Sequence, residues 1–251
     1  MKKTAIKTSL TKIKPGRIDI RGYDIEQLIG HYSFSQVSWL LLMETLPNPV
    51  QSKMFDAILV SCIDHGVNAP STHVARTVAS CGVPVQSAIS SGINAIGDFH
   101  GGAGEACAQM LQEATAQADN IDIEKTAKKI VLDFQRQGRR IPGLGHRIHN
   151  PDIRAIRLFK LAEELDLRKT HVSLIKAIQT ELKKINNKDL PINIDGAIAA
   201  LISDLGIHWR LGKSIFIIAR TVGIAAHVDE QIRNQKPLQF AAPVNVIYDL
   251  D

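Results

Sequence analysis

The stretch IPGLGHRIHNPDIRA, residues 141–155, decides how the fold of the chain is interpreted. Its segment PGLG is a flexible loop, and two histidines and two arginines follow within nine positions: His146, Arg147, His149 and Arg154. Pro151 then stands where a helix is predicted to begin, a place that tolerates the missing backbone N–H. Ordinary turns do not need so many groups that attract anions. The stretch therefore indicates a binding loop rather than a simple connection.

The composition favours a helical protein. Of the 251 residues, 45% are hydrophobic and 22% are charged, which is enough for the core of one large domain or of two modest ones. Aromatic residues make up only 5% of the chain, and alanine, isoleucine and leucine supply most of the apolar side chains. These residue types favour packed helices over a β-sandwich.

Helical periodicity continues through most of the chain, and only GRIDIRGY, residues 16–23, alternates like a strand. The segment PSTHVARTVASCG, residues 70–82, starts with proline and ends in glycine, as helices typically do. The predicted fold class is therefore all-α, with about ten helices. They are expected near residues 24–31, 34–46, 50–65, 70–82, 84–97, 101–118, 122–138, 152–165, 168–186, 194–205 and 212–234.

Two breaks in the helical pattern indicate a second lobe. They are GDFHGG, residues 97–102, and KINNKDLPIN, residues 184–193. We expect a large helical domain made of residues 1–98 and 190–251, and a small helical lobe made of residues 99–189.

Charge and the remaining composition argue against several classes of function. The net charge is +5 and the pI about 9.1, but no stretch alternates basic with aromatic residues and no nucleic-acid-binding motif occurs. A small polyanionic ligand explains the same charge. No signal-peptide pattern follows MKKTAIKTSL, and no apolar run reaches about 18 residues. We expect a soluble cytoplasmic protein without a nucleic-acid or membrane partner.

The chain has three cysteines, Cys62, Cys81 and Cys107, and no CxxC pair. Each lies in a helical pattern. In a reducing cytosol the simplest interpretation is three buried, reduced thiols.

His100 lies in GDFHGGAGEA, at the glycine-rich start of a predicted helix. A histidine there can simply cap the helix. Alternatively, the positive end of the helix dipole disfavours a protonated imidazole. A neutral imidazole can donate a hydrogen bond to a developing oxyanion without acting as an acid, and glycines let a substrate approach the backbone closely. Both interpretations stay open from this segment alone.

Asp195 lies in PINIDGAIAALI, where an apolar helix is predicted to begin. An aspartate at this place is a good N-cap, and the segment alone favours that interpretation. The alternative is a carboxylate general base in a water-poor pocket, with a pKa raised by apolar neighbours.

Three further residues are candidate ligands for carboxylates. His65 lies between a helix end and a turn, Arg154 lies early in the helix after NPD, and Arg220 is alone in an apolar helix. A buried arginine is costly unless it is paired, so each arginine should meet either a structural carboxylate or the carboxylate of a ligand. His146 and His149 are three positions apart, but no acidic or thiol partner lies close in the sequence, so no metal site is predicted.

The order of these motifs resembles that of the citrate synthase superfamily. The motifs are RGYDIEQL, DHGVNAPS, FHGGAGEA, PGLGHRIHNPDIRA, NIDG and ARTVGIAAHVDEQ, within residues 16–237. The resemblance implies a helical enzyme whose small lobe closes over the active site. It implies a homodimer, as is typical of the family, or a higher homo-oligomer. It also implies that a carbon–carbon bond is formed or broken beside a coenzyme A thioester, through an enol and without a metal.

The resemblance further implies a role for each candidate residue. His100 corresponds to the histidine that stabilises the enol of acetyl-CoA, and Asp195 to the base that takes a proton from the thioester methyl group. His146 corresponds to the residue that hydrogen-bonds the oxaloacetate carbonyl or, in reverse, the citryl hydroxyl. The substrate carboxylates are expected to bind His65, Arg154 and Arg220. The adenine of coenzyme A is expected along Pro142, Gly143, Leu144 and Gly145, and its phosphates near Arg139 and Arg140.

The chain departs from the synthases of this family at two places. They usually carry several further helices between the segments that correspond here to LLLMETLPNP and FDAILVSCIDHG. Where they have Arg-Pro near the C-terminus, lending an arginine to the partner's site, this chain has Lys236 and Pro237. A lysine at such a substrate-binding position keeps the charge but loses the two-pronged grip on a carboxylate. NIDG and the spacing in NPDIRA are closer to citryl-CoA lyases and to the lyase-like part of ATP citrate lyase.

The leading hypothesis is therefore a citryl-CoA lyase, which splits citryl-CoA into acetyl-CoA and oxaloacetate. The alternative is a compact citrate or methylcitrate synthase, which also hydrolyses the thioester. A non-catalytic binding subunit would be expected to lack His100, His146 or Asp195, and all three are present. The coenzyme A thioester is a substrate, and no tightly bound cofactor is expected. A partner ligase that makes the thioester is compatible with the absence of an ATP-binding motif, but nothing in the sequence demonstrates one.

Overall fold

The computed structural model describes residues 5–116, 121–146, 151–167, 169–187 and 189–238. This part of the chain contains eleven α-helices, one short 3₁₀ helix and three short strands. Its contacts divide it into two compact units, which are described separately. Unit 1 comprises residues 1–61 and 103–212, and unit 2 comprises residues 62–102 and 213–251.

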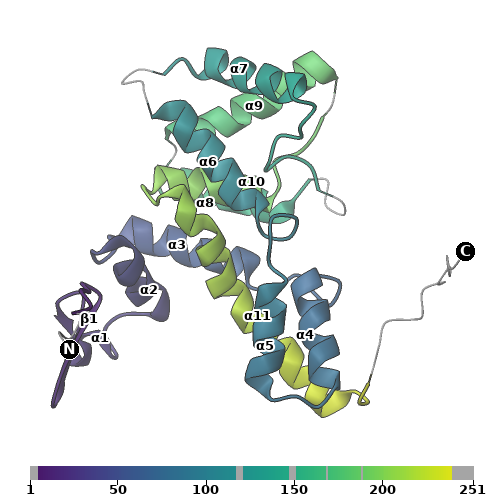
Figure 1. The fold of residues 1–251 in the computed structure, drawn as a ribbon. Coiled ribbons are helices and arrows are strands. Elements are labelled where there is room, and N and C mark those ends of the chain that lie inside the picture. The colour runs from purple at the N-terminus through teal and green to yellow at the C-terminus, as the bar shows by residue number, and fades with distance from the viewer. Residues whose placement is uncertain (1–4, 117–120, 147–150, 168, 188, 239–251) are drawn as a thin grey trace, which may run out of the picture. The chain divides into compact units, whose positions relative to one another are not determined.

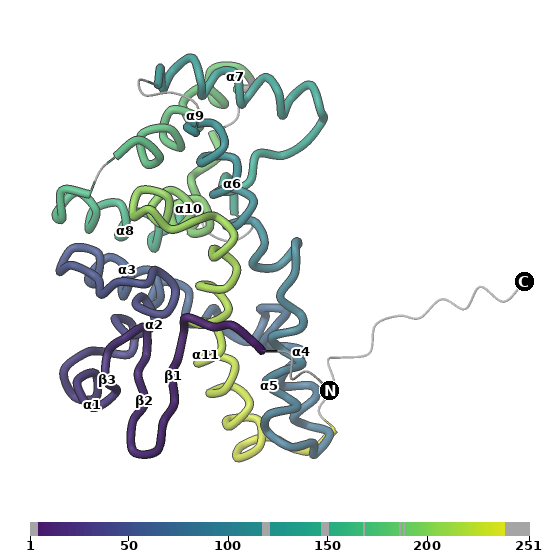
Figure 2. Tube along the Cα trace, turned by 60° about the vertical axis from the view of Figure 1, so that its left-hand side comes forward, coloured from purple at the N-terminus to yellow at the C-terminus, as the bar shows by residue number. Residues whose placement is uncertain are grey.

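The strands of unit 1 form a small antiparallel sheet. Its order is β1 (Thr11–Lys14), β2 (Arg17–Ile20) and β3 (Tyr23–Asp24), and the strands lie side by side in Figure 2. Ile13 pairs with Ile18, so two apolar side chains share one face. The strand-like pattern predicted at residues 16–23 is confirmed, but a turn at Arg21 and Gly22, both with positive φ, divides it into two strands.

The helices of unit 1 include one, α10, that is buried almost all round. The helices are α1 (Ile25–Leu28), α2 (Phe34–Met43), α3 (Pro49–Cys62), α6 (Ala103–Thr115), α7 (Ile123–Arg136), α8 (Ile153–Glu164), α9 (Thr170–Asn186) and α10 (Ile194–Asp204), with a 3₁₀ helix at Trp209–Leu211. Every residue of α10 except Asp195 is buried. The helix packs against α6, α8 and α9, as Figure 1 shows, which is the place expected for a helix that is apolar on all sides.

A buried carboxylate at the end of α10 fixes the start of α9. Asp204 accepts hydrogen bonds from the backbone N–H groups of Lys169, His171 and Val172, at 3.3, 2.9 and 3.1 Å. The Nδ1 atom of His171 donates a further bond of 2.8 Å to the same carboxylate. Because α9 has no capping side chain of its own, Asp204 satisfies donors at the helix start and ties α9 to α10.

Unit 2 is built from α4 (Pro70–Ser80), α5 (Val85–Asn94) and α11 (Gly212–Asn234), which begins at the last residue of unit 1. Gly92 lets the helices approach closely, since an added Cβ would lie 2.8 Å from the Ala75 Cβ and 3.1 Å from Ile224. The buried side chains of this core belong to Ala75, Ala79, Ala88, Ile96, Ile224 and Val228.

Within the described part of the chain, one segment, Trp209–Asn234, is long and apolar enough to cross a membrane by length and composition alone. This segment contains α11. The helix buries Ile224 and Val228 in the core of unit 2 and carries a buried cation, Arg220, near its middle. Burial in the core of unit 2 therefore accounts for part of its apolar character.

The predicted all-α class is confirmed, because each predicted helical range contains a helix. The prediction of three buried thiols is wrong for Cys81, which is exposed, whereas Cys62 and Cys107 are buried. Cys81 follows the last residue of α4 and precedes Gly82, whose φ of 79° turns the chain at the surface. The predicted lobe of residues 99–189 does not share its boundaries with the two contact units and stays a prediction about which parts move together.

Candidate active site

Unit 2 contains three of the predicted site residues, His65, His100 and Arg220. A tight turn positions His100, since its backbone N–H and carbonyl both bond to Gly97 at 3.0 Å. Gly101 follows with a φ of 86°, and a Cβ there would lie only 2.8 Å from the ring of Phe216. The glycine thus makes room for an aromatic ring of the same unit, besides any room that it gives to a substrate.

The imidazole of His100 is held by the first turn of α4. Its Nε2 lies 3.3 Å from the backbone nitrogen of Ser71 and 2.9 Å from the Ser71 hydroxyl. A backbone N–H can only donate, so Nε2 accepts and the ring proton resides on Nδ1. The helix start that meets the imidazole is therefore that of α4, whereas the sequence suggested the helix that follows His100. Held in this way, the neutral imidazole has its one N–H at Nδ1.

The electrostatic surroundings of His100 also favour its neutral form. Burial lowers the pKa of His100 below its ordinary value, and the positive charges of Arg220 and His65 lower it further. His65 lies in the turn after α3, near enough for its charge to act on His100. An imidazole in this position can stabilise an oxyanion by hydrogen bonding without giving up a proton.

Arg220 is the buried cation of unit 2, with 3% of its surface exposed. Its Nε donates a hydrogen bond of 3.0 Å to the carbonyl of Cys62, and its guanidinium carbon lies 4.8 Å from the centre of the Phe216 ring. These contacts orient a planar group that suits carboxylates.

Asp195 lies in the first turn of α10 and does not cap it. The N-cap is Asn193, whose side-chain oxygen accepts a hydrogen bond of 3.0 Å from the N–H of Gly196. The capping interpretation of Asp195 is therefore wrong, because a residue two positions earlier takes that role. Asp195 is half-buried, and an added Cβ on Gly104, in the first turn of α6, would lie 3.7 Å from its Oδ1.

The thiol of Cys107 is buried and lies close enough to Asp195 for the charge of the carboxylate to act on it. Burial, and secondly the negative charge of Asp195, strongly raise the pKa of Cys107. The thiol therefore stays protonated and apolar in character. Asp195 thus has a poorly hydrated neighbour on α6, as the general-base hypothesis requires.

The predicted coenzyme A loop, Pro142–Gly145, docks on the start of α10. The N–H of Asn193 donates to the carbonyl of Gly143 at 3.0 Å, and the Asn193 side-chain amide donates to the carbonyl of Gly145 at 2.7 Å. Leu144 and Ile192 form an antiparallel bridge beside these bonds. His146 follows the loop directly. Hydrogen bonds therefore connect the segment that ends in His146 with the segment that leads into Asp195, both within unit 1.

Two glycines make this docking close enough. Gly143 has a φ of 85°, and an added Cβ would lie 2.7 Å from the Cα of Gly196 and 2.8 Å from the sulfur of Cys107. A Cβ on Gly196 would strike the carbonyl oxygen of Gly143. Any larger residue at either position would separate the loop from the helix that carries Asp195.

Asp152 connects Arg154 with the first residue of α10. Its carboxylate, which is fully buried, accepts bonds of 3.0 and 2.9 Å from Nε and Nη2 of Arg154 and one of 3.0 Å from the N–H of Ile194. Burial acts to raise the pKa of Asp152, but the bonds from Arg154 and Ile194 outweigh it and lower the pKa, so the group stays ionised. Arg154 therefore has a structural carboxylate partner, one of the two outcomes expected for it.

The remaining predicted residues lie at the surface. Arg139 and Arg140 are exposed just before the loop, with the Arg139 guanidinium 5.2 Å from the centre of the Phe134 ring. Lys236 is exposed after α11, two residues before Leu238, whose N–H bonds to the carbonyl of Ser80 at 2.8 Å. Arg147 and His149 lie outside the described residues. Among the residues that the structure describes, no cluster of three or more His, Cys, Asp or Glu side chains could hold a metal ion.

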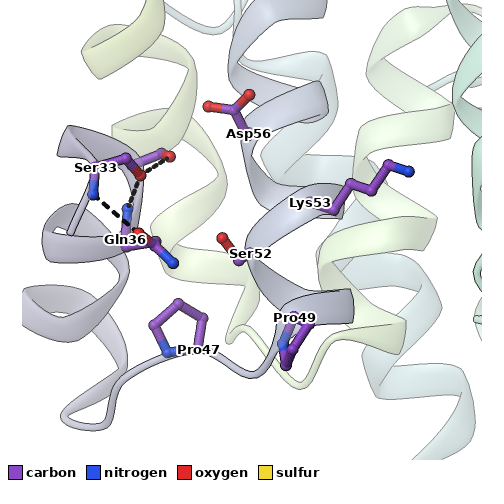
Figure 3. Close-up of a pocket in the computed structure, with 8 residues that line it drawn as sticks. Ser33, Gln36, Pro47, Pro49, Ser52, Lys53 and Asp56 are labelled. Carbon is purple, nitrogen blue, oxygen red and sulfur yellow. Dashed lines mark hydrogen bonds between the residues drawn. The ribbon is translucent and has the colours of Figure 1, made fainter. Parts of the chain in front are cut away.

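One cleft within unit 1 contains no predicted site residue. It has a volume of about 500 Å³ and opens between α2 and α3, beside Ser33, Gln36, Ser52, Lys53 and Asp56, as Figure 3 shows. Its polar groups partly bond to one another, as in the reciprocal bonds of Ser33 and Gln36 that cap α2. None of its lining residues belongs to the motifs that carry the resemblance, and no histidine lines it.

Four residues of the site were missed from the sequence, namely Ser71, Asp152, Asn193 and Gly196. Asn193 and Gly196 flank Asp195 in NIDG, and Asp152 lies in NPDIRA, so the motifs contained them without showing their roles. The signal available was an Asn directly before the first residue of an apolar helix, which is a preferred N-cap residue. Nothing local indicated the partnership of Ser71 with His100, 29 residues away.

Known proteins show which class this fold and these motifs define. The family model described as "Citrate synthase, C-terminal domain" matches residues 1–55 and 46–241. The chain therefore belongs to the citrate synthase family, and the resemblance seen in the motifs is confirmed. The two matched segments meet at residues 46–55, where the sequence indicated that the further helices of the synthases are missing.

Individual proteins of known structure or sequence are similar to this chain over most of its length. The structure of citryl-CoA lyase from Hydrogenobacter thermophilus is 33% identical, covers 98% of both chains and has a TM-score of 0.86. The structure of ATP citrate lyase from Methanothrix soehngenii, in complex with citrate and coenzyme A, shares the fold at 21% identity and a TM-score of 0.84, with 100% of this chain and 42% of that chain covered. The citrate synthase of Helicobacter pylori is 32% identical over 218 residues, 82% of this chain and 50% of its own length. The chain spans about a third to somewhat over half of the length of the curated relatives it matches.

The lowered pKa of His100 predicts its titration. In an NMR titration of the histidine side chains, the midpoint of His100 should fall below the ordinary 6.5, and Arg220→Gln should move it back toward 6.5 because one positive charge is lost. In the wild-type protein, His100 has a lower pKa in the folded state than in the unfolded chain. The unfolded chain therefore binds more protons as the pH drops below 6.5, and the contribution of His100 to the free energy of unfolding falls. His100→Gln assigns the signal, and a midpoint at or above 6.5 contradicts the electrostatic account.

The contact between Gly143 and Gly196 predicts the effect of one added methyl group. Gly196→Ala should lower the free energy of unfolding by roughly 1–3 kcal/mol, the usual cost of overpacking, and should weaken coenzyme A binding because the loop is displaced. Urea unfolding and calorimetric titration with coenzyme A measure the two effects. Gly97→Ala is the control, because its Cβ would meet nothing within 4 Å. Equal behaviour of the two variants would refute the close approach.

Proposed function

We propose that this protein is a citryl-CoA lyase that cleaves citryl-CoA to acetyl-CoA and oxaloacetate. The observation that carries the proposal is the agreement with the citryl-CoA lyase of Hydrogenobacter thermophilus over 98% of both chains. His100, His146 and Asp195 are all present at the motif positions. The units that contain them supply a neutral imidazole and a half-buried carboxylate, which are the groups that enol chemistry without a metal requires.

The first step breaks the carbon–carbon bond. His146 accepts the proton of the citryl hydroxyl, whose oxygen becomes the carbonyl of oxaloacetate. The electron pair of the broken bond moves into the thioester and places negative charge on its oxygen. The Nδ1–H of His100 donates a hydrogen bond to this oxygen and stabilises the enolate. The support is the bond from the Ser71 N–H to Nε2, which reserves the proton of the ring for Nδ1.

The second step completes acetyl-CoA. Asp195 enters the cleavage direction protonated, delivers its proton to the CH₂ carbon of the enolate and forms the methyl group. The proton that His146 accepted returns to Asp195 through solvent, which restores both groups. In the reverse direction the ionised Asp195 removes a proton from the methyl group. The half-buried position of Asp195 in the first turn of α10, beside the buried thiol of Cys107, supports this role.

The remaining residues bind the two ends of the substrate. We assign the carboxylates to His65, Arg154 and Arg220. Arg220 is oriented by Cys62 and Phe216, and Asp152 occupies the Nε edge of Arg154, so a ligand carboxylate would meet the outer nitrogens of that guanidinium. Lys236 is proposed to contribute its charge to the site of a partner subunit.

We assign the adenine of coenzyme A to the loop of Pro142, Gly143, Leu144 and Gly145, and the phosphates to the exposed Arg139 and Arg140. The assembly is proposed to be a cytoplasmic homodimer with no tightly bound cofactor. Citryl-CoA must come from a reaction that couples citrate to coenzyme A, so a separate ligase is a proposed partner.

A compact citrate or methylcitrate synthase is the second candidate, supported by the 32% identity to the citrate synthase of Helicobacter pylori. A synthase hydrolyses the thioester and a lyase does not. With acetyl-CoA and oxaloacetate as substrates, we therefore expect no sustained release of free thiol, whereas supplied citryl-CoA should be cleaved to both products. Sustained release of coenzyme A would favour the synthase instead. If neither acetyl-CoA with oxaloacetate nor citryl-CoA is turned over, the hypothesis of a non-catalytic binding protein remains.

The role of Asp195 predicts the effect of a neutral isostere. Asp195→Asn should lower kcat for citryl-CoA cleavage by about 10²–10⁴-fold, the contribution typical of a general acid or base, with little change in KM. Asp189→Asn is the matched control, because this exposed carboxylate pairs with Lys183 at the surface of the same unit. Product formation followed by chromatography measures both variants, and an Asp195→Asn enzyme as active as the control would refute the assignment.

A further inference from the structure

One face of α11 holds the turn that carries His65. The Nε of Arg220 donates to the carbonyl of Cys62 at 3.0 Å. Gly223 packs so closely that an added Cβ would strike the carbonyl of Ile63 and lie 3.0 Å from Oδ1 of Asp64. The Nε2 of His227 lies 3.2 Å from the same Oδ1. Residues 220, 223 and 227 are three and four positions apart and therefore share one side of the helix.

Asp64 is the centre of this turn. Its Oδ2 accepts a hydrogen bond of 3.0 Å from the N–H of Gly66. Burial acts to raise the pKa of Asp64, but bonds from the N–H groups of Gly66 and His65 and from His227 outweigh it and lower the pKa. The carboxylate is therefore ionised, and it fixes the backbone on both sides of the His65 imidazole.

His227 is itself held in place. Its Nδ1 lies 3.7 Å from Oε2 of Glu230, one turn further along α11. Glu230 forms an ion pair of 2.6 Å with Arg76 of α4, the helix whose first turn holds His100 through Ser71. The side chain of His227 is 17% exposed, so its ring has little freedom to leave this position.

We propose that His227 is a positioning residue for His65, acting through the carboxylate of Asp64. His227 does not touch the reacting atoms. It orients Asp64, Asp64 fixes the backbone N–H groups of His65 and Gly66, and the His65 imidazole is thereby aimed at a substrate carboxylate. The inference rests on the proposed function for the role of His65, but the link from His227 to His65 does not depend on it. Groups that hold a binding residue in its productive orientation contribute to affinity without contacting the ligand.

The link is tested by a double-mutant cycle. His227→Ala should raise KM for citryl-CoA, and the Kd for oxaloacetate, by about tenfold, the scale of one hydrogen bond to a charged group, while kcat changes little. In a His65→Ala background the same substitution should have no further effect, because its target is gone. His227→Gln, which keeps a side-chain donor, should restore most of the affinity. His73→Ala, an exposed histidine on α4, is the matched control.

Several outcomes would overturn the inference. The first is an unchanged KM in His227→Ala. The second is a double variant in which the effects of the two single substitutions multiply. The third is a fall in kcat and in thermal stability that accompanies the rise in KM. A wild-type protein that neither cleaves citryl-CoA nor binds oxaloacetate would instead contradict the proposed function. In that case the NMR signals of the His65 side chain decide the inference: they should move in His227→Ala and stay unchanged in His73→Ala.

Discussion

The close approach of Gly143 to Gly196 is the constraint on which the organisation of unit 1 depends. A Cβ on either residue would collide with the backbone of the other, so only two glycines allow the loop to reach the helix. Because they meet, the side chain of Asn193 can cap α10 and bind the carbonyl of Gly145 at the same time. The loop before His146 and the helix turn that carries Asp195 are therefore fixed to one another by backbone contacts, which vary less than contacts between long side chains.

In unit 2 a buried cation has the corresponding role. Arg220 is removed from water, yet its Nε bonds to a backbone carbonyl and its plane lies over Phe216. Its charge lowers the pKa of His100, and the N–H of Ser71 fixes the tautomer of that imidazole. A positive field beside a neutral hydrogen-bond donor favours anionic carboxylates and a developing oxyanion together.

Each unit therefore prepares its own part of the proposed chemistry. The tautomer of His100 is set by Ser71 of unit 2, and the helix turn that carries Asp195 is held by Asn193 and Gly143 of unit 1. These contacts within each unit hold the tautomer of His100 and the helix cap beside Asp195.

The sequence by itself determined the helices, the family and the candidate residues for the site. Helical periodicity and the proline and glycine signals are local, so the helices were found where they were predicted, and the order of the motifs identified the family. Only the tertiary structure decided which groups become partners. Asn193 and not Asp195 caps α10, α4 supplies the helix start for His100, Arg154 pairs with Asp152, and Cys81 is exposed. The physical reason is distance along the chain: the bond from Arg220 to Cys62 joins residues 158 positions apart, and only packing selects such a pair from the other donors and acceptors that the sequence offers.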